Sequence, residues 1–413
     1  MFFYNIAIIF LSIGVKIGSI FSSKLKLFVN GRAHIFKELK NRKSGDYIWL
    51  HCASLGEFIL AEPLLKQIKS ETDYKICVTF FSPSGYEARK NTELADLVVY
   101  MPLDFYSNAQ AFVTELKPVI AIFSKYDFWI HHIQVLAEKK IPIVAISSYF
   151  YPEQIYFKSF AGFYRKALQK FDHFFVINES SKSLLSQINI NKVTVSGDTR
   201  FDKVFETSKL AYTNAVIEEF VEDEKVLVVG SAWEQDIAVM APLINKKNFH
   251  YKVIIAPHEV GKENITKLLT YFKKDVVLYT DAANKCLHCH DILIIDTIGI
   301  LSKIYKYATV AYVGGAFKQG LHNILEPLAF GKPVLCGNNL NKFPEALIAK
   351  EKEVLFPVQN ADEFEKELLD LFKHENKLDI CKEKSYKLTK DNLGATQKIW
   401  DYLSIKLTTK FQA

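Results

Sequence analysis

The segment that decides the fold reads VAYVGGAFKQGLHNILEP, residues 310–327. It begins with apolar residues typical of a buried strand, continues through paired glycines and a loop with a lysine, and ends in a helix-like stretch. Gly314, Gly315 and Gly320 allow backbone amides to approach a phosphate, which the dipole of the following helix also attracts. This order of strand, glycine loop and helix predicts an anion-binding unit of an α/β domain.

Two polar side chains share one face at the start of the expected helix. The carboxylate of Glu326 can accept hydrogen bonds from both ribose hydroxyls of a nucleotide, and Asn323 lies on the same face. A plain turn followed by a helix is the alternative interpretation, which explains the glycines but not the pair of polar residues. We therefore interpret residues 310–327 as a nucleotide site.

The same alternation of apolar runs and helix-like stretches extends over almost the whole chain. The runs are rich in β-branched and aromatic residues, which is typical of parallel sheets covered on both faces. A polar segment, residues 206–224, interrupts the alternation and divides the chain into two doubly wound, Rossmann-like halves. The expected strands are 47–51, 76–80, 97–100, 119–123, 141–146 and 173–177 in the first half, and 225–229, 252–255, 276–279, 292–295, 309–313, 333–335 and 354–356 in the second.

The composition fits this architecture. The chain has 413 residues, of which 49% are hydrophobic and 24% charged, so it is long enough for two domains and is not a disordered chain. The six cysteines form no paired framework, and four of them stand alone, mostly in apolar runs: Cys52, Cys77, Cys336 and Cys381. This pattern is typical of a reducing compartment.

The first 43 residues account for all of the net charge of +6, and the remainder of the chain is close to neutral. Their lysines and arginines face a single acid, Glu38, and follow an apolar run from Phe2 to Val15. The run is shorter than the roughly 20 residues of a spanning helix. An apolar segment followed by bases fits an anchor on an anionic membrane surface, whereas a signal peptide carries its bases ahead of the run. A buried first helix is the alternative interpretation.

Ligands of doubly wound sheets bind beyond the carboxyl ends of the strands, so segments directly after strands are candidates for function. Residues 51–57 read HCASLGE. Small residues there, including Ser54 and Gly56, permit a tight turn that places Glu57 in the first turn of the next helix, with its carboxylate toward the cleft between the halves. Complementing the helix dipole is the alternative role of this glutamate.

Two further segments carry candidate ligands. Residues 230–236 read GSAWEQD, a Gly-Ser turn that opens a helix and offers Ser231 as an N-cap or phosphate donor. Residues 286–290 read CLHCH, whose Cys-x-x-Cys spacing invites a zinc interpretation. A tetrahedral site needs a second ligand cluster at a suitable distance, and none follows. We therefore predict no metal site.

Taken together, these segments resemble the Kdo transferases of lipopolysaccharide synthesis, which are GT-B glycosyltransferases with two domains. The family's Ser-x-Gly-Glu turn matches residues 53–57, its Gly-Ser turn resembles residues 230–234, and its Asp-Thr-x-Gly segment matches residues 296–299. The long signature Gly-Gly-x-Phe…Gly-x-His-Asn-x-Leu-Glu-Pro matches Gly314 to Pro327, and Asn-x-Gly-Ala-Thr matches residues 392–396. The resemblance covers almost the whole chain.

Three segments depart from the family pattern. The Glu-Thr-Glu-Leu-Trp-Pro segment reads KYDFWI at residues 125–130 and keeps one acid, Asp127. The Asn-Ala-Arg loop is replaced by residues 147–150. The Arg-His-Pro-Glu-Arg segment is shortened to APHE at residues 256–259 and lacks both arginines. Candidates to replace their contacts with the donor phosphate are His258, Lys262 and Lys318.

The resemblance implies inverting, metal-independent transfer of Kdo from CMP-Kdo to a lipid A precursor, lipid IVA. It implies neither a cofactor nor a nucleic-acid partner, and it places the chain at the cytoplasmic face of a Gram-negative inner membrane. A nucleotide-sugar epimerase and a non-catalytic, membrane-bound nucleotide-sugar sensor are the alternatives. Glu57 would be the general base; the donor would contact Ser231, His258, Gly314, Gly315, Lys318, Asn323 and Glu326, and the acceptor would lie near Ser54, Gly56, Lys125 and Asp127.

These observations predict five parts of the chain. An anchor segment covers residues 1–21, and an N-terminal acceptor domain covers 22–205. A linker, 206–224, leads to a C-terminal CMP-Kdo domain at 225–390. The final part, 391–413, is a helix that packs back on the first domain.

Overall fold

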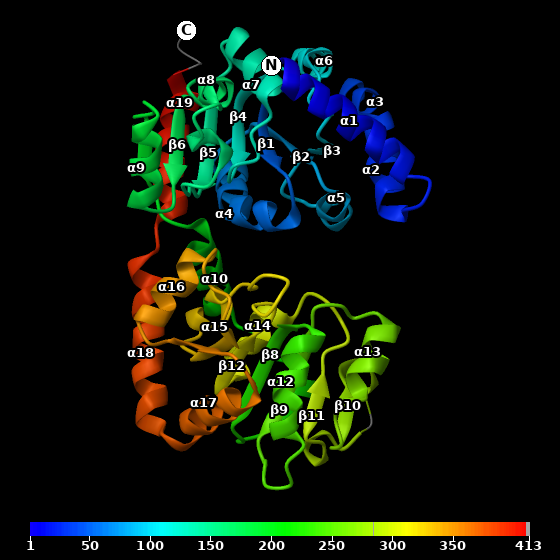
Figure 1. The fold of residues 1–413 in the computed structure, drawn as a ribbon, viewed down its shortest axis with the longest axis vertical. Coiled ribbons are helices and arrows are strands. Elements are labelled where there is room, and N and C mark those ends of the chain that lie inside the picture. The colour runs from blue at the N-terminus through cyan, green and yellow to red at the C-terminus, as the bar shows by residue number, and fades with distance from the viewer. Residues whose placement is uncertain (284, 410–413) are drawn as a thin grey trace. The chain divides into compact units, whose positions relative to one another are not determined.

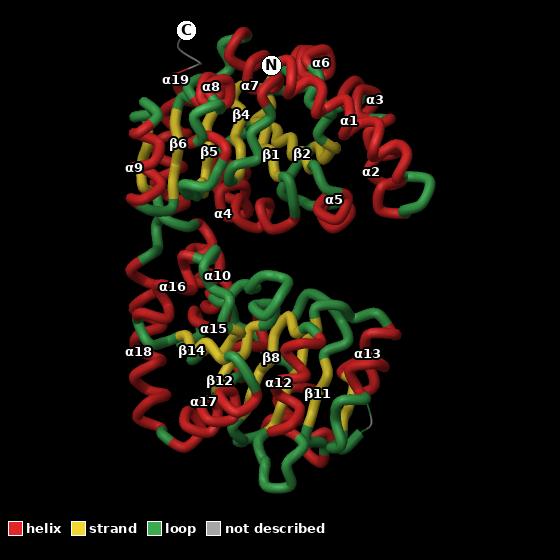
Figure 2. Tube along the Cα trace, viewed as in Figure 1, coloured by secondary structure: helices red, strands yellow, loops and turns green. Residues whose placement is uncertain are grey.

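The computed structural model describes residues 1–283 and 285–409. The chain divides into two compact units: unit 1 comprises Met1–Asp202 and Leu393–Ala413, and unit 2 comprises Lys203–Asn392. Each unit contains one parallel sheet with helices on both faces (Figures 1 and 2). This arrangement confirms the predicted pair of doubly wound α/β halves. Residues 410–413 of the expected C-terminal helix lie outside the described residues.

The sheet of unit 1 has seven parallel strands in the order β3-β2-β1-β4-β5-β6-β7. The order reverses direction between β1 and β4, so the loops after these two strands border the switch point, where doubly wound sheets bind ligands. Strand β7 was not among the expected strands, because its three residues are only half-buried and form no apolar run. The strands are β1 (Tyr47–Cys52), β2 (Lys75–Phe80), β3 (Leu97–Tyr100), β4 (Pro118–Ser124), β5 (Ile143–Ser148), β6 (His173–Val176) and β7 (Val193–Val195).

Alternate residues of β1 point to opposite faces of the sheet, as the period of a strand requires. Trp49 joins the core cluster on one face, whereas Leu50 joins the cluster that includes side chains of α4 and α19 on the other. The indole of Trp400 in α19 donates to Glu71 in α4 over 2.9 Å. The helices of this unit are α1 (Phe2–Gly18), α2 (Ser23–Ala33), α3 (Ile35–Lys40), α4 (Leu55–Glu71), α5 (Pro83–Arg89), α6 (Tyr106–Leu116), α7 (Ile130–Glu138), α8 (Gly162–Leu168), α9 (Glu179–Gln187) and α19 (Ala395–Thr409), with the 3-10 turn η1 (Ile155–Phe157).

The first helix, α1, lies on unit 1 with one face and exposes apolar side chains on the other. The hydroxyl of Tyr4 donates to Asp104, and Asn5 hydrogen-bonds His131 with Oδ1 and Nε2 separated by 2.7 Å. Among the strongly apolar side chains of α1, only Ile8 is buried. The most exposed ones in this region are Phe2, Phe3, Phe10, Ile20 and Phe21, at 70–85%.

In the described part of the chain, no single helix has both the length and the apolar character needed to cross a membrane. The segments 2–18 and 23–40 meet that criterion only as a pair, with a bend of 119° between them.

The sheet of unit 2 also has seven parallel strands, in the order β10-β11-β9-β8-β12-β13-β14. Its switch point lies between β8 and β12. Strand β8 is longer than expected, because the pairing with β9 resumes at Ala232 after a register shift, where Ser231 adopts a φ of +52°. The strands are β8 (Val226–Ala232), β9 (Lys252–Pro257), β10 (Val276–Leu278), β11 (Ile292–Ile294), β12 (Val310–Val313), β13 (Val334–Gly337) and β14 (Leu355–Val358).

Helices cover both faces of the second sheet as well (Figure 2). Residues 206–224, expected as a linker, contain the end of α10 (Thr199–Lys209) and all of α11 (Ala215–Val221). The other helices are α12 (Glu234–Ile244), α13 (Lys262–Leu269), α14 (Leu301–Ile304), α15 (Leu325–Ala329), α16 (Pro344–Glu351), α17 (Ala361–Lys373) and α18 (Glu375–Asp391), with the 3-10 turns η2 (Tyr279–Asp281), η3 (Leu287–Cys289) and η4 (Tyr305–Tyr307).

Candidate active site

The switch point of unit 1 contains the turn from β1 into α4. Ser54 is the N-cap of α4, and its backbone N–H donates to Oε2 of Glu57 over 2.9 Å, as part of a capping box. Glu57 therefore helps to cap α4, a structural role that differs from the helix-dipole role given as the alternative interpretation. Its part in the chemistry stays a prediction. A Cβ added at Gly56 would meet no atom closer than 3.8 Å, so packing does not require glycine in this turn.

The pKa of the Glu57 carboxyl group is higher than that of an ordinary glutamate. Only 9% of the residue is exposed. Burial raises the pKa of Glu57, and the nearby carboxylate of Asp127 raises it further, against the opposing effects of His51, Lys125 and the Ser54 N–H. A buried carboxylate with a raised pKa is well suited to accept a proton from a substrate hydroxyl.

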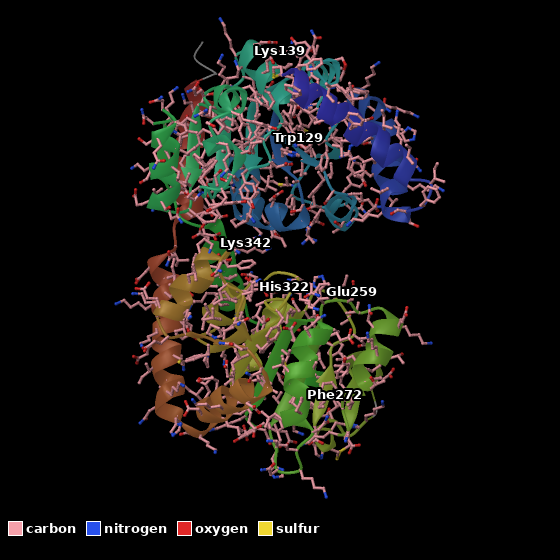
Figure 3. The ribbon with its side chains drawn as sticks, viewed as in Figure 1. Trp129, Lys139, Glu259, Phe272, His322 and Lys342 are labelled. Atoms are coloured by element: carbon pink, nitrogen blue, oxygen red, sulfur yellow. A yellow bond between two sulfur atoms is a disulfide. The ribbon has the colours of Figure 1, made fainter. Side chains whose placement is uncertain are left out.

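Asp127 follows β4 and is held by two ring N–H groups. Its Oδ2 accepts from the indole of Trp129 over 3.0 Å and lies 3.0 Å from Nε2 of His51. His51, the last residue of the expected first strand, was not among the predicted site residues. Figure 3 labels Trp129 at this site and His322 at the corresponding site of unit 2.

Lys125, a predicted acceptor-side residue, lies near a second buried carboxylate. Arg200 forms a bidentate pair with Asp198, with N–O distances of 2.6–3.1 Å. Burial opposes ionisation of Asp198, but Arg200, and to a smaller extent Lys125, hold the pKa of Asp198 below its ordinary value. This pair was not predicted, since it lies just beyond β7, the strand that was not predicted either.

The switch point of unit 2 is built around Asp236, which joins the loops after β8 and β12. The side chain is 1% exposed. It accepts from the backbone N–H groups of Trp233 and Gly315 over 2.9 and 3.0 Å, and from the hydroxyl of Tyr312 over 2.9 Å. Asp236 was not predicted as a site residue, because its role depends on a strand 76 residues away in the chain.

Two glycines are required for these loops to approach each other. A Cβ at Gly314 would lie 2.4 Å from the carbonyl oxygen of Ser231, and a Cβ at Gly315 would lie 2.3 Å from the carbonyl oxygen of Gly320. Gly315 also adopts a φ of +96°, which disfavours other residues. The N–H groups of both glycines are already bonded, to Gly230 and Asp236. They therefore shape the loop, and they do not present free amides to a phosphate as expected.

Three aromatic rings form a layered surface beside this loop. The indole N–H of Trp233 donates to Nε2 of His322 over 3.0 Å, and the two rings are within 15° of parallel. His258 stacks on both, with ring centroids 4.3 and 4.6 Å away. Burial lowers the pKa of His322 to about 4, and it also lowers the pKa of His258. Both rings are thus neutral near pH 7.

Asn323 and Glu326 lie together, as the sequence analysis expected. The amide of Asn323 donates to Oε1 of Glu326 over 3.1 Å. Burial raises the pKa of Glu326 to about 7, despite this hydrogen bond and the nearby charge of Lys203. Helix α15, which carries Glu326, has only five residues, so its dipole contributes little to anion binding.

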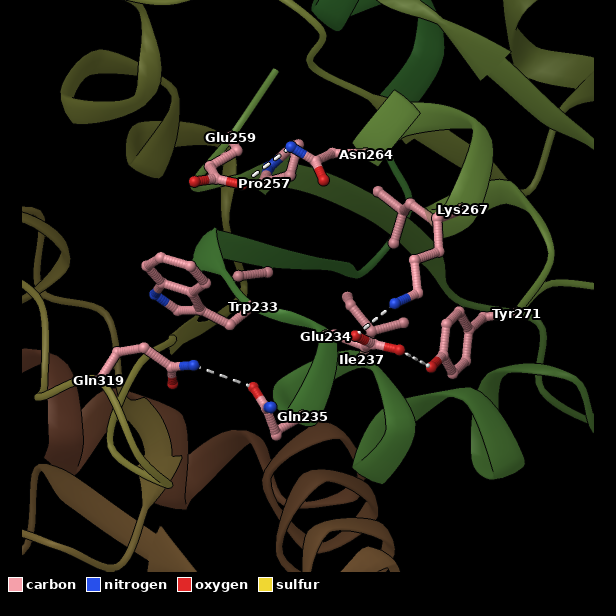
Figure 4. A pocket seen from close by; sticks show the side chains of 12 residues that line it. Trp233, Glu234, Gln235, Ile237, Pro257, Glu259, Asn264, Lys267, Tyr271 and Gln319 are labelled. Atoms are coloured by element: carbon pink, nitrogen blue, oxygen red, sulfur yellow. Dashed lines mark hydrogen bonds and ion pairs between the residues drawn. The ribbon is translucent and has the colours of Figure 1, made fainter. Parts of the chain in front are cut away.

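The remaining predicted donor residues differ in their surroundings. Lys318 is exposed in the loop after β12. Ser231 is not the N-cap of α12, since Trp233 occupies that position. A cavity of about 240 Å³ opens beside Trp233, between α12 and α13. Figure 4 shows Lys267 and Tyr271 reaching Glu234 at one end of this cavity, and Gln319 reaching Gln235 at the other.

The cysteines depart from the expectation in one place. Cys286 and Cys289 form a disulfide across the turn η3, which their three-residue separation allows. Their sulfurs and a ring nitrogen of His288 lie within 4.8 Å of one another, although sulfurs in a disulfide are not thiolate ligands. The other four cysteines are free and buried.

Comparison with known proteins identifies the family. Residues 29–203 match the family described as 3-deoxy-D-manno-octulosonic-acid transferase (kdotransferase), and residues 298–388 match glycosyl transferases group 1. The chain belongs to the Kdo transferase family of glycosyltransferases. It is 28% identical to the 3-deoxy-D-manno-octulosonic acid transferase of Chlamydophila psittaci, over 74% of this chain and 72% of that protein, and 24% identical to the one of Haemophilus influenzae, over 86% of each.

One relative is much longer than this chain. The chain is 28% identical to a bifunctional glycosyltransferase/methyltransferase of Fusobacterium nucleatum over 83% of its own length, and it spans only 55% of that protein.

Solved structures agree on the GT-B-like fold of the family. A UDP-GlcNAc 2-epimerase of Neisseria meningitidis superimposes with a TM-score of 0.61 at 17% identity, covering 86% of this chain and 99% of that one. A glycosyltransferase of Rickettsia africae does so with a TM-score of 0.55 at 13% identity, covering 88% and 98%. At these identities the likeness concerns the fold alone.

Proposed function

We propose that this chain transfers Kdo from CMP-Kdo to a lipid A precursor, lipid IVA, with inversion at the anomeric carbon and without a metal. The observation that carries the proposal is the buried carboxylate of Glu57 at the switch point of unit 1, in a chain of the Kdo transferase family. Inverting transfer needs a base that accepts the proton of the attacking hydroxyl, and Glu57 has the burial and the proton affinity for that role.

The bond changes follow from these groups. A hydroxyl of the acceptor attacks the anomeric carbon of Kdo while Glu57 accepts its proton, and the bond from that carbon to the CMP phosphate oxygen breaks. CMP leaves with the electron pair of that bond, and Glu57 later returns its proton to water. Charge that develops on the leaving phosphate is stabilised by donors of unit 2.

His322 is the best-placed donor for that phosphate. Because the indole of Trp233 donates to Nε2, the neutral ring carries its proton on Nδ1 and can donate from there. Lys318 is exposed in the neighbouring loop and supplies a positive charge. These two side chains take the place of the arginines missing from residues 256–259.

The proposed transfer is tested by incubating the full chain with CMP-Kdo and lipid IVA and measuring the lipid by mass spectrometry. Addition of Kdo to the lipid, unchanged by EDTA, is the expected result. A changed nucleotide sugar without a lipid product would indicate the epimerase alternative, and no reaction with intact CMP binding would indicate a sensor.

The donor site gives a prediction for CMP binding. Replacing Glu326 with alanine removes the proposed ribose contact and should weaken CMP binding by about 1.5–3 kcal/mol, the range for a hydrogen bond to a charged group. Because burial raises the pKa of Glu326 to about 7, the charged fraction of its carboxylate grows as the pH rises through that value. Wild-type affinity should therefore increase as the pH rises from 6 to 8, and the variant should lose this dependence.

Calorimetry at several pH values measures both effects. Glu363→Ala is a suitable control, since Glu363 is a half-buried glutamate in the first turn of α17 whose carboxylate, like that of Glu326, accepts a local hydrogen bond, here from the N–H of Gln359. Equal CMP affinity of wild type and Glu326→Ala across the pH range would place the ribose elsewhere.

We further propose that α1 and the following turn rest on an anionic membrane surface, where the lipid acceptor is embedded. Full burial of a phenylalanine side chain contributes about 1.5–3 kcal/mol. The double variant Phe10→Glu, Phe21→Glu should therefore bind anionic vesicles at least about tenfold more weakly, because these side chains are 70% and 85% exposed.

Vesicle sedimentation measures this loss, and Ile380→Glu in α18, at a 52% exposed position, is the matched control. Transfer to acceptor dispersed in detergent should persist in the double variant. Unchanged vesicle binding would show that α1 does not hold the chain at the membrane.

A further inference from the structure

Two polar side chains are buried in the sheet of unit 1 directly beneath the candidate base. His51 and Thr79 are both 0% exposed and are paired residues of the neighbouring strands β1 and β2. A buried polar group destabilises the fold unless it is hydrogen-bonded. The partners of these two groups therefore indicate why the sheet contains them.

The hydrogen bonds around His51 form one continuous series. The indole N–H of Trp49 donates to the hydroxyl oxygen of Thr79 over 2.9 Å, and that oxygen lies 2.8 Å from Nδ1 of His51. Nε2 of His51 lies 3.0 Å from Oδ2 of Asp127. Trp49 faces the apolar core of unit 1, whereas the side chain of Asp127 is 28% exposed, so the series leads from the core to the site.

The direction of each bond follows from the groups at the two ends. The indole only donates, and an ionised carboxylate only accepts. Thr79 therefore accepts from Trp49 and donates its own hydrogen to Nδ1, while Nε2 of the imidazole donates to Asp127. Every donor then meets an acceptor, and this single tautomer of His51 satisfies the whole series.

Packing keeps the imidazole in place. The ring of Phe123 in β4 meets it edge-on, with centroids 5.7 Å apart. On the other side of Asp127, the indole N–H of Trp129 donates to the same Oδ2 over 3.0 Å. Two ring N–H groups thus converge on one carboxylate oxygen, which fixes its position.

We propose that His51 is a positioning residue of the transferase, which holds the carboxylate of Asp127 in place beside Glu57. This role rests on the proposed function, because it assumes that Glu57 accepts the acceptor's proton. The charged and titratable groups that face Glu57 are His51 and Cys52 of β1 and Lys125, Tyr126 and Asp127 after β4. Asp127 has the largest effect of these groups on the pKa of Glu57.

Two substitutions of His51 separate positioning from mere packing. The amide nitrogen of glutamine reaches about as far as Nε2 of histidine, whereas the amide of asparagine reaches only as far as Nδ1. His51→Gln should therefore keep the bond to Asp127 and behave nearly as wild type. His51→Asn should lose that bond and reduce turnover by about tenfold to a hundredfold, the latter being the loss that a 1 Å misplacement can cause.

The pH profile is the decisive measurement. When Asp127 is no longer held beside Glu57, Glu57 gives up its proton at lower pH, so the acidic limb of the turnover profile should lie at lower pH in His51→Asn than in His51→Gln. Both variants lack the imidazole, whose own effect lowers the pKa of Glu57, so this comparison isolates the position of Asp127. The double variant His51→Asn, Asp127→Asn should lose little beyond Asp127→Asn, because His51 acts through Asp127. Additive losses, or acidic limbs at the same pH in His51→Asn and His51→Gln, overturn the proposal.

A second readout does not depend on the reaction. Carbon NMR of glutamate carboxyl groups, with Glu57→Gln used for assignment, follows the titration of Glu57 in the wild type and in His51→Asn. A lower midpoint in His51→Asn than in His51→Gln, titrated in the same way, is expected, and equal midpoints in the two variants contradict the proposal even if no lipid product forms. Thermal unfolding and CMP affinity of the same variants show whether both units are folded. If His51→Asn fails to fold, the titration of Glu57 is measured instead in Thr79→Val. This variant replaces the hydroxyl with a methyl group and so removes the hydrogen bond to Nδ1 of His51.

Discussion

Replacing Glu57 with glutamine is expected to reduce Kdo transfer by about a hundredfold or more, the contribution usual for a positioned base. Glutamine preserves the shape of the side chain, and its carbonyl oxygen can still accept the Ser54 N–H that now bonds to Oε2. The amide cannot accept a proton from the attacking hydroxyl. Initial rates of lipid product formation measure the loss, and calorimetry with CMP shows that donor binding in unit 2 is intact.

The same variant should not be less stable than the wild type. The pKa of Glu57 is raised in the folded chain, mainly by burial and then by Asp127. An acid whose folded pKa lies above its unfolded value loses stability as the pH rises through these values, because ionisation is less favourable in the fold. The neutral amide avoids this loss, so its melting temperature at pH 7 should be equal or higher. Near-normal transfer by the variant would remove Glu57 from the mechanism.

The wild-type enzyme should also reveal this raised pKa directly. Its transfer rate should fall on the acid side with a midpoint above the ordinary glutamate value of about 4.3, because only the ionised carboxylate accepts the proton. A midpoint at or below that value would mean that another group limits the rate.

Most of the strands could be predicted from the sequence because most of their residues are buried. Parallel sheets covered on both faces need continuous apolar runs, and β4 is buried at all seven positions. β7 could not be found in this way, since its residues are half-buried. The end of β8 was also misplaced, because a register shift at Ser231 continues the pairing where a Gly-Ser turn was expected.

The site was predictable where its contacts are local in sequence. Ser54 and Glu57 are three residues apart, as are Asn323 and Glu326, and each pair is hydrogen-bonded. His51 could not be recognised in this way, since its partners lie 28 and 76 residues along the chain. Which side chains meet across a sheet depends on register, and the sequence alone does not specify it.

The contacts of the N-terminal helix could not be predicted from the sequence either. Its apolar run and the bases behind it were evident, but the polar contacts of Tyr4 and Asn5 with residues about 100 positions away were not. These contacts make α1 part of the fold of unit 1, while the exposed phenylalanines remain available to a membrane. Deleting the segment would therefore remove structural contacts together with any membrane contact, which is why point substitutions are the better test.

Asp104 is the centre of those contacts, and replacing it with asparagine is expected to destabilise unit 1 by about 3–5 kcal/mol, the usual loss when one partner of a buried charged network is removed. The residue is 0% exposed. Its carboxylate accepts from the backbone N–H groups of His131 and His132 at the start of α7, from Nδ1 of His132 over 2.6 Å, and from the Tyr4 hydroxyl. An asparagine would present an N–H₂ group to some of these donors and leave them unpaired.

Thermal unfolding at several pH values tests this expectation, with Tyr4→Phe as the control that removes only the contact from α1. The melting temperature of Asp104→Asn should fall by about 10 °C at pH 7, and that of Tyr4→Phe by much less.

Burial alone would raise the pKa of Asp104, but hydrogen bonds from His132, Tyr4 and the His131 N–H outweigh it and hold that pKa below its ordinary value. An acid of this kind contributes stability above its unfolded pKa and loses it as the pH falls toward the folded value. The difference in melting temperature between wild type and Asp104→Asn should therefore shrink below about pH 4. Equal melting temperatures at pH 7 would mean that the Asp104 carboxylate does not stabilise the packing of α1 and α7 in unit 1.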